Sequence, residues 1–441
     1  MLRAAPALLV LALALMPGQT RAWESDSLRL DGETRIRFLA RILTEDAGQD
    51  QDFLQTADLD LVEKPWGHLG LSLSGDLRQD IDGRRPAERV QDVRDTQSPV
   101  LHGYLYRAHA DLTRLGPLER LRIGRQYVDG PLPAHLDGAR LELRFLDRRL
   151  RLEAYGGLPV RFFDRDTEWW DAQQAGAAAT GRLTGSTRLT AAYQFWGEAG
   201  DDGTEAAHQA ALVLRQDLLE LLHLKAAFVW LDERPRSLSM SILAHLDEVG
   251  FEGHLRYRVQ VATIERVPTS ASPFVALLGP SRPHHKVALW LGQRLADDVF
   301  LYSDTAARLL GTTVEDSEFN HGYVREALGL SVDDLLVDGL RIEVHGDLWN
   351  TLSAEQDTLV VAGGGEIRYR IPNFLRLSAG GQYSLYKYDY LLDDNEKTRV
   401  YTVFGRGRIF PVPWLYLAVD YELEIYDVLA HRLSVTIGQR I

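Results

Sequence analysis

The fold is decided by the stretch Leu28-Arg29-Leu30-Asp31-Gly32-Glu33-Thr34-Arg35-Ile36-Arg37-Phe38. Every even position in it holds an apolar or small residue, and every odd position holds a charged one. Successive side chains of a β-strand point to opposite faces, so this alternation gives one apolar face and one charged face. A helix would spread the same charges around its whole circumference. The stretch therefore predicts a strand whose two faces meet different surroundings.

The same alternation returns along the chain, at 139–145, 150–155, 251–259, 340–345 and 375–379. The alternating segments run for roughly 10–14 residues, whereas strands of soluble sheets usually have about five or six. That length suits a tilted strand that crosses a membrane. Such strands show alternation rather than a continuous apolar run.

The connections between these segments are of two kinds. Tight breaks occur at Gly116-Pro117, Leu146-Asp147-Arg148, Gly185-Ser186, Ala296-Asp297-Asp298, Asp333-Asp334, Ile371-Pro372-Asn373 and Pro411-Val412-Pro413. Longer polar segments cover 81–98, 159–172, 263–283, 309–320 and 388–396. Short turns at one rim and long loops at the other are typical of outer-membrane barrels, where the short turns face the periplasm.

These connections also give a strand count. An opening strand near 27–42, ten hairpins and a closing strand at 429–441 make 22 strands, and 18–22 fit the pattern. An even number places both termini on the periplasmic side. We therefore expect an all-β fold: a single transmembrane antiparallel β-barrel of the outer-membrane type.

Residues 1–22 have the features of a secretory signal peptide. Arg3 supplies the positive start, Ala7 to Met16 is apolar, and Thr20 and Ala22 are small residues before the expected cleavage site. Ten apolar residues are too few for a membrane-spanning helix. The sequence thus predicts export, with residues 23–441 forming the barrel and the bacterial cell outer membrane as its location.

The composition excludes several classes of protein. Among 441 residues there are 49 Lys and Arg, 63 Asp and Glu, and no Cys, for a net charge of −14. Without Cys there are no disulfides, Cys-ligated zinc sites, iron–sulfur clusters or covalently attached c-type haem. An acidic chain gains nothing from nucleic-acid phosphates. We expect no cofactor and no nucleic-acid partner.

Six tryptophans near turns or strand ends predict an aromatic belt at the membrane interface: Trp66, Trp196, Trp230, Trp290, Trp349 and Trp414. Amphipathic rings favour that level of a bilayer.

The charged face of the strands should line the interior, because charges are costly in lipid. The pore-lining candidates are Arg107, Arg122, Arg125, Gln126, Asp137, Arg140, Glu142, Arg144, Arg149, Arg151, Arg256, Arg258, Arg341, Arg368 and Arg370. Two interpretations stay open. The arginines form a selectivity surface for anionic or sugar-like solutes, or they pair with acids across strands as ladders that hold the wall. The Arg-dense hairpin 120–151 is the strongest functional candidate.

That hairpin also carries a family resemblance. Arg122-Ile123-Gly124-Arg125-Gln126-Tyr127, followed by Asp137-Gly138-Ala139-Arg140-Leu141, resembles a hairpin of the alginate export family of outer-membrane porins. The resemblance covers roughly 25 residues and implies an Arg-rich lumen that passes an anionic polysaccharide. It implies a place in the pore constriction or wall for Arg125, Gln126, Asp137 and Arg140. The chain differs from the family pattern at Val128-Asp129-Gly130-Pro131 and in its acidity.

The remaining motifs do not indicate a binding or catalytic site. Gly363-Gly364-Gly365 opens no helix, so a close strand approach is expected instead of a phosphate loop. His284-His285 lacks the spacing of a catalytic metal site. The acidic stretch 45–52 predicts a solvated loop, and the alternative is a loop that binds a surface cation such as Ca²⁺. No Gly-x-Ser-x-Gly motif or other catalytic set stands out, so no enzyme is predicted.

The sequence thus predicts a porin-like or exporter-like channel that passes small, anionic or saccharide solutes. One alternative is a barrel sleeve in a porin–cytochrome electron conduit, which requires a periplasmic or multihaem cytochrome partner. A second is a barrel-embedded lipid-modifying enzyme. Outer-membrane lipid and the barrel-assembly machinery are the other expected partners.

Overall fold

The computed structural model describes residues 23–25, 27–44, 49–64, 67–81, 101–161, 172–200, 203–219, 221–262, 282–311, 322–352, 359–386, 398–426 and 428–440. The expected signal peptide lies outside these residues. In the described part of the chain, no helix is long and apolar enough to span a bilayer.

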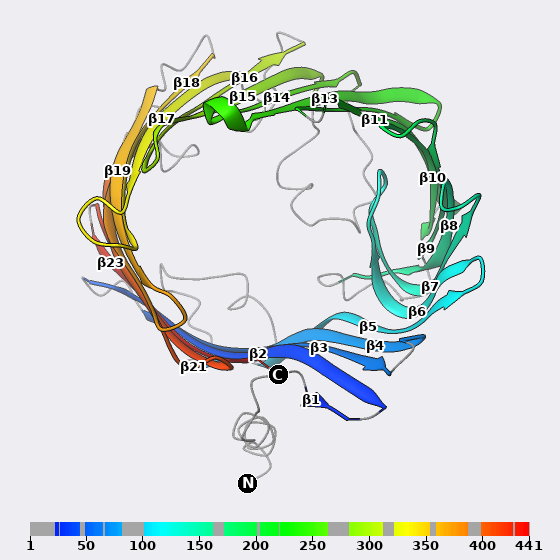
Figure 1. The fold of residues 1–441 in the computed structure, drawn as a ribbon, viewed down its shortest axis with the longest axis horizontal. Coiled ribbons are helices and arrows are strands. Elements are labelled where there is room, and N and C mark those ends of the chain that lie inside the picture. Colours follow the sequence, from blue (N-terminus) through cyan, green and yellow to red (C-terminus); the bar gives the residue numbers. More distant parts are fainter. Residues whose placement is uncertain are drawn as a thin grey trace.

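Twenty-two long antiparallel strands, β2 to β23, form one closed barrel (Figure 1). Each strand pairs with its neighbour in the sequence, and β2 pairs with β23 from Glu33↔Arg440 to Leu43↔Ala430, which closes the sheet. Closure leaves no free sheet edge between the first and last strands. The predicted fold class and the count of 22 are confirmed.

The strands, in chain order, are β1 (Trp23–Glu24), β2 (Leu28–Leu43), β3 (Gln49–Glu63), β4 (Leu69–Asp80), β5 (Leu101–Leu115), β6 (Leu118–Val128), β7 (Ala134–Phe145), β8 (Leu150–Pro159), β9 (Ala172–Arg182), β10 (Thr187–Gly200), β11 (Gly203–Leu218), β12 (Leu222–Leu231), β13 (Arg234–Leu246), β14 (Phe251–Gln260), β15 (His284–Ala296), β16 (Val299–Leu310), β17 (Tyr323–Asp333), β18 (Leu340–Thr351), β19 (Leu359–Ile371), β20 (Leu375–Tyr386), β21 (Thr398–Val412), β22 (Leu415–Ile425) and β23 (Leu429–Arg440). The two-residue β1 pairs only with β2. A 3₁₀ turn, η1 (Asp247–Val249), joins β13 to β14.

The two rims of the barrel differ as predicted. Every predicted tight break falls in or beside a connection at the rim where β2 begins and β23 ends, which we call the turn rim. The opposite rim, the loop rim, has the wide intervals between described strands: 81–100, 160–171, 261–283, 311–322 and 387–397.

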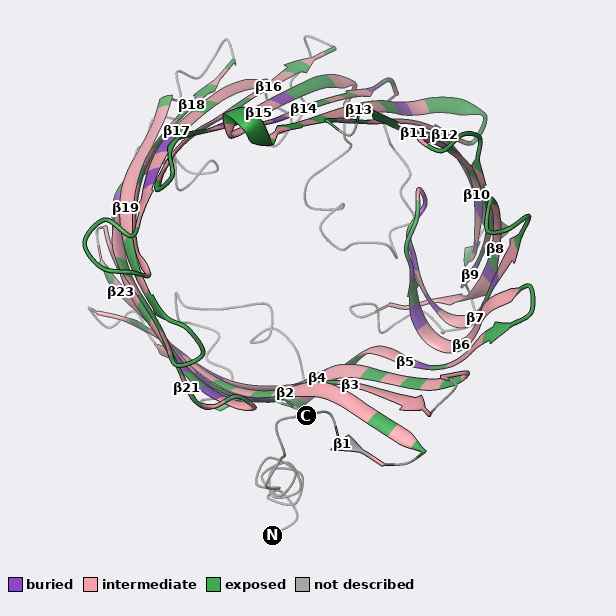
Figure 2. Ribbon diagram, viewed as in Figure 1, coloured by how far each residue is buried: buried purple, intermediate pink, exposed green. Residues whose placement is uncertain are grey.

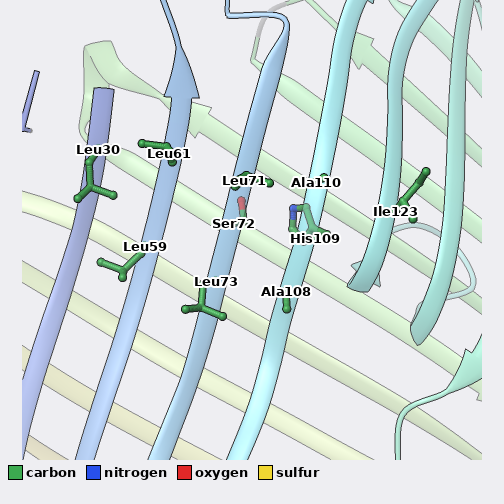
Figure 3. A pocket seen from close by; sticks show the side chains of 10 residues that line it. All are labelled: Leu30, Leu59, Leu61, Leu71, Ser72, Leu73, Ala108, His109, Ala110 and Ile123. Atoms are coloured by element: carbon green, nitrogen blue, oxygen red, sulfur yellow. The ribbon is translucent and has the colours of Figure 1, made fainter. Parts of the chain in front are cut away.

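The apolar parity of the strands faces outward. Leu30, Leu59, Leu71 and Ile123 lie on β2, β3, β4 and β6, with the opposite wall of the barrel behind them (Figure 3). Large exposed apolar side chains continue on this parity around the barrel, as at Leu328. Apolar groups in contact with lipid cost nothing, so their exposure fits a membrane-facing surface.

The aromatic belt is only partly as predicted. Trp230 lies on the outer face against Phe228, with ring centroids 3.9 Å apart. Trp290 and Trp349, in contrast, lie on the charged parity, and Trp349 stacks on Tyr323 with centroids 4.3 Å apart. Trp196 shares that parity, as the register partner of Gln174. The position of a tryptophan near a rim therefore does not determine whether its side chain lies on the outer or the inner face. Trp66 lies outside the described residues.

Three diagonal Tyr–His pairs form hydrogen bonds on the outer face near the loop rim. The Tyr Oη to His Nδ1 distances are 2.6 Å for Tyr193–His208, 2.8 Å for Tyr257–His285 and 2.9 Å for Tyr421–His431. Such half-polar rings suit the level of lipid headgroups.

The acidic stretch 45–52 is not the expected loop in its second half. Gln49 begins β3, and Asp50 and Asp52 are buried on the inner face, where Arg41 contacts both. Residues 45–48 lie outside the described part.

Candidate functional site

The hairpin formed by β6 and β7 leaves the wall and enters the barrel. Pairing between β5 and β6 ends at Ala108↔Arg125, although β5 continues to Leu101. Beyond that pair, the end of the hairpin lies inside the ring, beside β9 and β10 (Figure 1). The lumen is therefore narrowed on this side.

A line of glycines permits the bend. Gly124 has a φ of 124° and pairs with Gly138, which in turn pairs with Gly157. A Cβ at Gly138 would lie 2.1 Å from the carbonyl oxygen of Gly156, and one at Gly157 would lie 2.3 Å from that of Asp137. Only glycine allows backbones to approach this closely.

The underside of the hairpin packs against the wall. Val128, Ala134 and Leu136 form a buried apolar cluster with Tyr155 of β8. Gln194 of β10, which is 0% exposed, donates from Nε2 to the carbonyl oxygen of Pro133 at 3.4 Å. Figure 2 shows buried residues on this hairpin inside the ring. These contacts identify the parity of Tyr155 and Gln194 as the inner face of the barrel.

The opposite face of the hairpin points away from the wall it covers. On it, Tyr127 stacks on His135 with ring centroids 3.8 Å apart, and the Tyr127 side chain remains 43% exposed. Arg125 donates to both carboxylate oxygens of Asp137, at 2.8 and 2.6 Å. A bidentate pair of this kind is geometrically specific.

Side chains of the hairpin also bind the strand that it left. Arg125 Nη1 donates to the carbonyl oxygen of Leu105 at 2.9 Å, and His135 Nε2 donates to that of Tyr106 at 2.8 Å. Both carbonyls belong to the part of β5 that has no β6 partner. The hairpin is thus tied to the wall on both sides, as a fixed constriction requires.

Below the bend, the Arg-dense wall is a ladder of ion pairs. Arg140 is 5% exposed and lies 3.1 Å from a carboxylate oxygen of both Glu142 and Glu153. Glu142 is 3% exposed and is also contacted by Arg151 at 2.7 Å. Arg122 makes a two-pronged contact with Asp111, at 2.7 and 2.9 Å. Charges buried in this way must be paired.

Similar ladders occur elsewhere on the inner face. Arg107 contacts Asp58 and lies 3.5 Å from Asp60. Arg368 pairs with Glu366 at 2.5 Å and Glu343 at 3.4 Å. The remaining predicted arginine there, Arg341, lies 3.5 Å from Asp333 and 3.7 Å from Glu343.

The other predicted residues of the hairpin are distributed differently. Gln126 is 0% exposed beneath the hairpin, and its Nε2 donates to the carbonyl oxygen of Gly138 at 3.3 Å. Arg144 pairs with Glu119 at 2.9 Å. Arg149 is exposed in the turn between β7 and β8, so it belongs to the turn rim and not to the wall. Arg370 pairs in register with Arg376 near the same rim.

Arg256 and Arg258 on β14 stand apart from these ladders. Both are exposed, and neither forms an ion pair with any residue that the structure describes. The sequence analysis missed other cations of this kind, which the strand register places beside them: Arg182, Arg188, Arg215, Lys225 and Lys286. Each lies on the inner parity, and the alternation of its own strand was the available signal.

The discarded motifs have structural roles. Gly364 faces a close strand, because a Cβ there would lie 2.6 Å from the carbonyl oxygen of Gly381. His284 and His285 point to opposite faces of β15. Among the described residues, no three His, Asp or Glu side chains are grouped to hold a metal ion.

A closed barrel of 22 antiparallel strands, apolar outside and charged inside, defines the class of outer-membrane-type β-barrels. No family model and no curated protein matches this chain. Among solved structures, the P pilus usher (PapC) translocation pore is similar with a TM-score of 0.56 and 8% identity, over 93% of this chain and 100% of that one.

Two further structures are similar at lower scores. A BenF-like porin from Pseudomonas fluorescens Pf-5 has a TM-score of 0.46 and 10% identity, over 94% of this chain and 99% of that one. Acinetobacter baumannii OccAB3 has a TM-score of 0.44 and 10% identity, over the same shares. At such identities the usher similarity supports the barrel fold and nothing finer.

Proposed function

We propose that this protein is an outer-membrane channel that passes small hydrophilic solutes, anionic or saccharide in character, through a lumen narrowed by the β6–β7 hairpin. One observation carries the proposal: a hairpin tied on both sides lies inside a closed barrel, where its exposed face presents Tyr127, Arg125 and Asp137. A barrel of this strand number is too wide to be filled by side chains alone. A constriction is then needed to select solutes.

The inner wall supports the chemistry of the solute. Its ladders are hydrophilic and pair arginines with acids, while Arg188, Arg215 and Arg256 remain exposed. Guanidinium groups match carboxylates and phosphates in geometry. The hairpin occupies interior space that a sheathed cytochrome would need, which favours the channel over the sleeve.

Conductance tests this function. Purified protein in planar bilayers should give stable, stepwise currents. A variant in which residues 129–133 are replaced by Asn-Gly, with Tyr127→Ser and His135→Ser, should conduct more, because the tip shrinks and its exposed ring stack is removed. Replacing Asp232-Glu233, the turn between β12 and β13, by Asn-Gly is the matched control at the same rim. Absence of any channel over repeated insertions would overturn the proposal.

The proposed orientation places the turn rim in the periplasm and the loop rim outside the cell. The chain has no Cys, so any thiol labelling comes from the cysteine that is introduced. Asp232→Cys at the loop rim should be labelled on intact cells by a membrane-impermeant thiol reagent, and Asp297→Cys at the turn rim should not. Labelling of Asp297→Cys alone would invert the orientation.

A further inference from the structure

The exposed cations of the inner wall lie in register from strand to strand. Arg182 at the end of β9 faces Arg188 on β10, which faces Arg215 on β11, which faces Lys225 on β12. Directly opposed residues share a face, with Cβ atoms about 4.5–5.5 Å apart. Four cations in one unbroken cross-strand row would repel one another, so the row is not explained by stability.

The row continues onto the next strands. Lys225 faces Ser241 on β13, and Ser241 faces Arg256 on β14. Two residues farther along β14, Arg258 faces Lys286 on β15. The row thus departs from a continuous line of paired cations at two described places: Ser241, which is itself a hydrogen-bond donor, and the step of two residues from Arg256 to Arg258 on β14.

The row also crosses the height of the barrel. Arg182 is the last residue of β9, at the turn rim, whereas Lys286 is the third residue of β15, at the loop rim. This climb follows from the stagger of strands that tilt against the barrel axis. A row of register partners is therefore a diagonal path from one mouth of the lumen toward the other.

These cations are available to a solute. Arg182, Arg188, Arg215, Lys225 and Arg256 are all exposed, and within the described ranges none forms an ion pair. The acids on the same strands have other partners. Asp217 lies 2.8 Å from His223, and Glu252 lies 3.5 Å from His245.

We propose that this row, from Arg182 to Lys286, is a binding track for anions that carry two or more carboxylate or phosphate groups. The proposal rests on the channel function and names where and how the channel recognises its solute. A monovalent anion meets one cation at a time and is weakly held. A multivalent anion bridges neighbouring cations, so its second contact forms at a high effective concentration. Steps between equivalent positions then allow movement along the row.

Tripolyphosphate is the probe, and the readout is the concentration that halves the single-channel KCl current. Arg215→Gln/Lys225→Gln removes two adjacent cations from the row. Each exposed contact contributes modestly, so we expect block by tripolyphosphate to weaken by roughly fivefold to twentyfold. Heat-modifiability on gels confirms that the variant is folded, and Arg256→Gln/Arg258→Gln serves as a second variant.

The matched control is Arg35→Gln/Arg432→Gln. It removes the same formal charge from the inner face at β2 and β23, where the two arginines pair with Glu33 and Glu422. Charges more than about 8 Å apart are largely screened at physiological salt, so block should change by less than about twofold.

The outcomes separate the two proposals. A wild-type protein that forms no pores refutes the channel. The track alone is refuted if wild-type pores conduct but are not blocked by tripolyphosphate. It is also refuted if the row variants and the control variant weaken the block equally. Weaker block in the row variants only supports the track. Longer polyphosphate that blocks better than tripolyphosphate identifies a chain as the solute, and equal block identifies a small multivalent anion.

Discussion

On β6 to β8 the arginines of the inner wall pair with acids, whereas on β9 to β14 a row of exposed arginines has no acid partner among the described residues. Arg140, 5% exposed between Glu142 and Glu153, represents the first region. Arg188, exposed between Arg182 and Arg215, represents the second. Both regions are inner wall of the same barrel and both are rich in arginine.

The difference shows that the number of arginines in a region does not measure the charge that a solute meets. In the ladder, each guanidinium lies against at least one carboxylate, and such cross-strand pairs hold neighbouring strands together. In the row, the electrostatic field is left uncompensated and projects into the lumen. We therefore infer that stability and selectivity depend on different sectors of one sheet.

Charges placed on the outer face should lower the free energy of unfolding most, and they should do so equally in the two regions. Leu141→Arg on β7 and Leu212→Arg on β11 each place a charge in lipid, at a cost of about 2–4 kcal/mol at mid-depth. Both leucines are exposed on the outer parity. Urea unfolding in detergent-free liposomes measures the loss, with Leu141→Met and Leu212→Met as controls. A large difference between the two sites would mean that the sectors differ in more than their inner faces.

The next effect separates the regions directly. Arg140→Met leaves Glu142 with Arg151 at 2.7 Å and Arg120 at 3.8 Å, and Glu153 with Arg151 at 3.2 Å. We expect a loss of about 2 kcal/mol, below the roughly 3–5 kcal/mol for breaking a fully buried pair, because Arg151 stays. Arg188→Met removes an exposed side chain and should change stability by less than about 0.5 kcal/mol. Equal losses by the same unfolding measurement would end the distinction.

Selectivity should show the reverse order. Arg144→Gln/Glu119→Gln removes a whole ion pair without changing net charge, so the reversal potential in a KCl gradient should stay where it is. Arg188→Gln/Arg215→Gln removes uncompensated charge and should move that potential toward cation preference. A shift in the first variant alone would return selectivity to the Arg-dense hairpin.

Much of the barrel could be predicted because its signals are local. The alternation of 28–38 gives a strand and its two faces, and the turn at Gly116-Pro117 even pairs Asp111 with Arg122 by symmetry about it. Alternation of faces counted from Leu340 puts Trp349 on the charged parity. The predicted aromatic belt is therefore wrong at Trp349, where nearness to a strand end was used in place of alternation.

The site depended on information that is not local. The bend at Gly124 arises from close approach to β5 and Gly138, which no single strand reveals. The row joins Arg258 to Lys286 across the interval 261–283, and the register of strands so far apart in sequence is set only by the closed sheet. The two interpretations of the arginines, as ladders or as a selectivity surface, therefore apply to different positions. The structure shows the ladders among the described residues, and the selective role of the row stays a prediction.

Salt should affect the two regions differently, although the change is small. Raising KCl from about 0.1 M to about 1 M shortens the screening length from about 10 Å to about 3 Å. The field of the exposed row acts across open lumen, so the difference in reversal potential between wild type and Arg188→Gln/Arg215→Gln should shrink. The Arg140–Glu142 contact is 3.1 Å long and buried, so the stability lost in Arg140→Met should change little over the same range. If the stability difference faded with salt while the selectivity difference persisted, the roles given to the two regions would have to be exchanged.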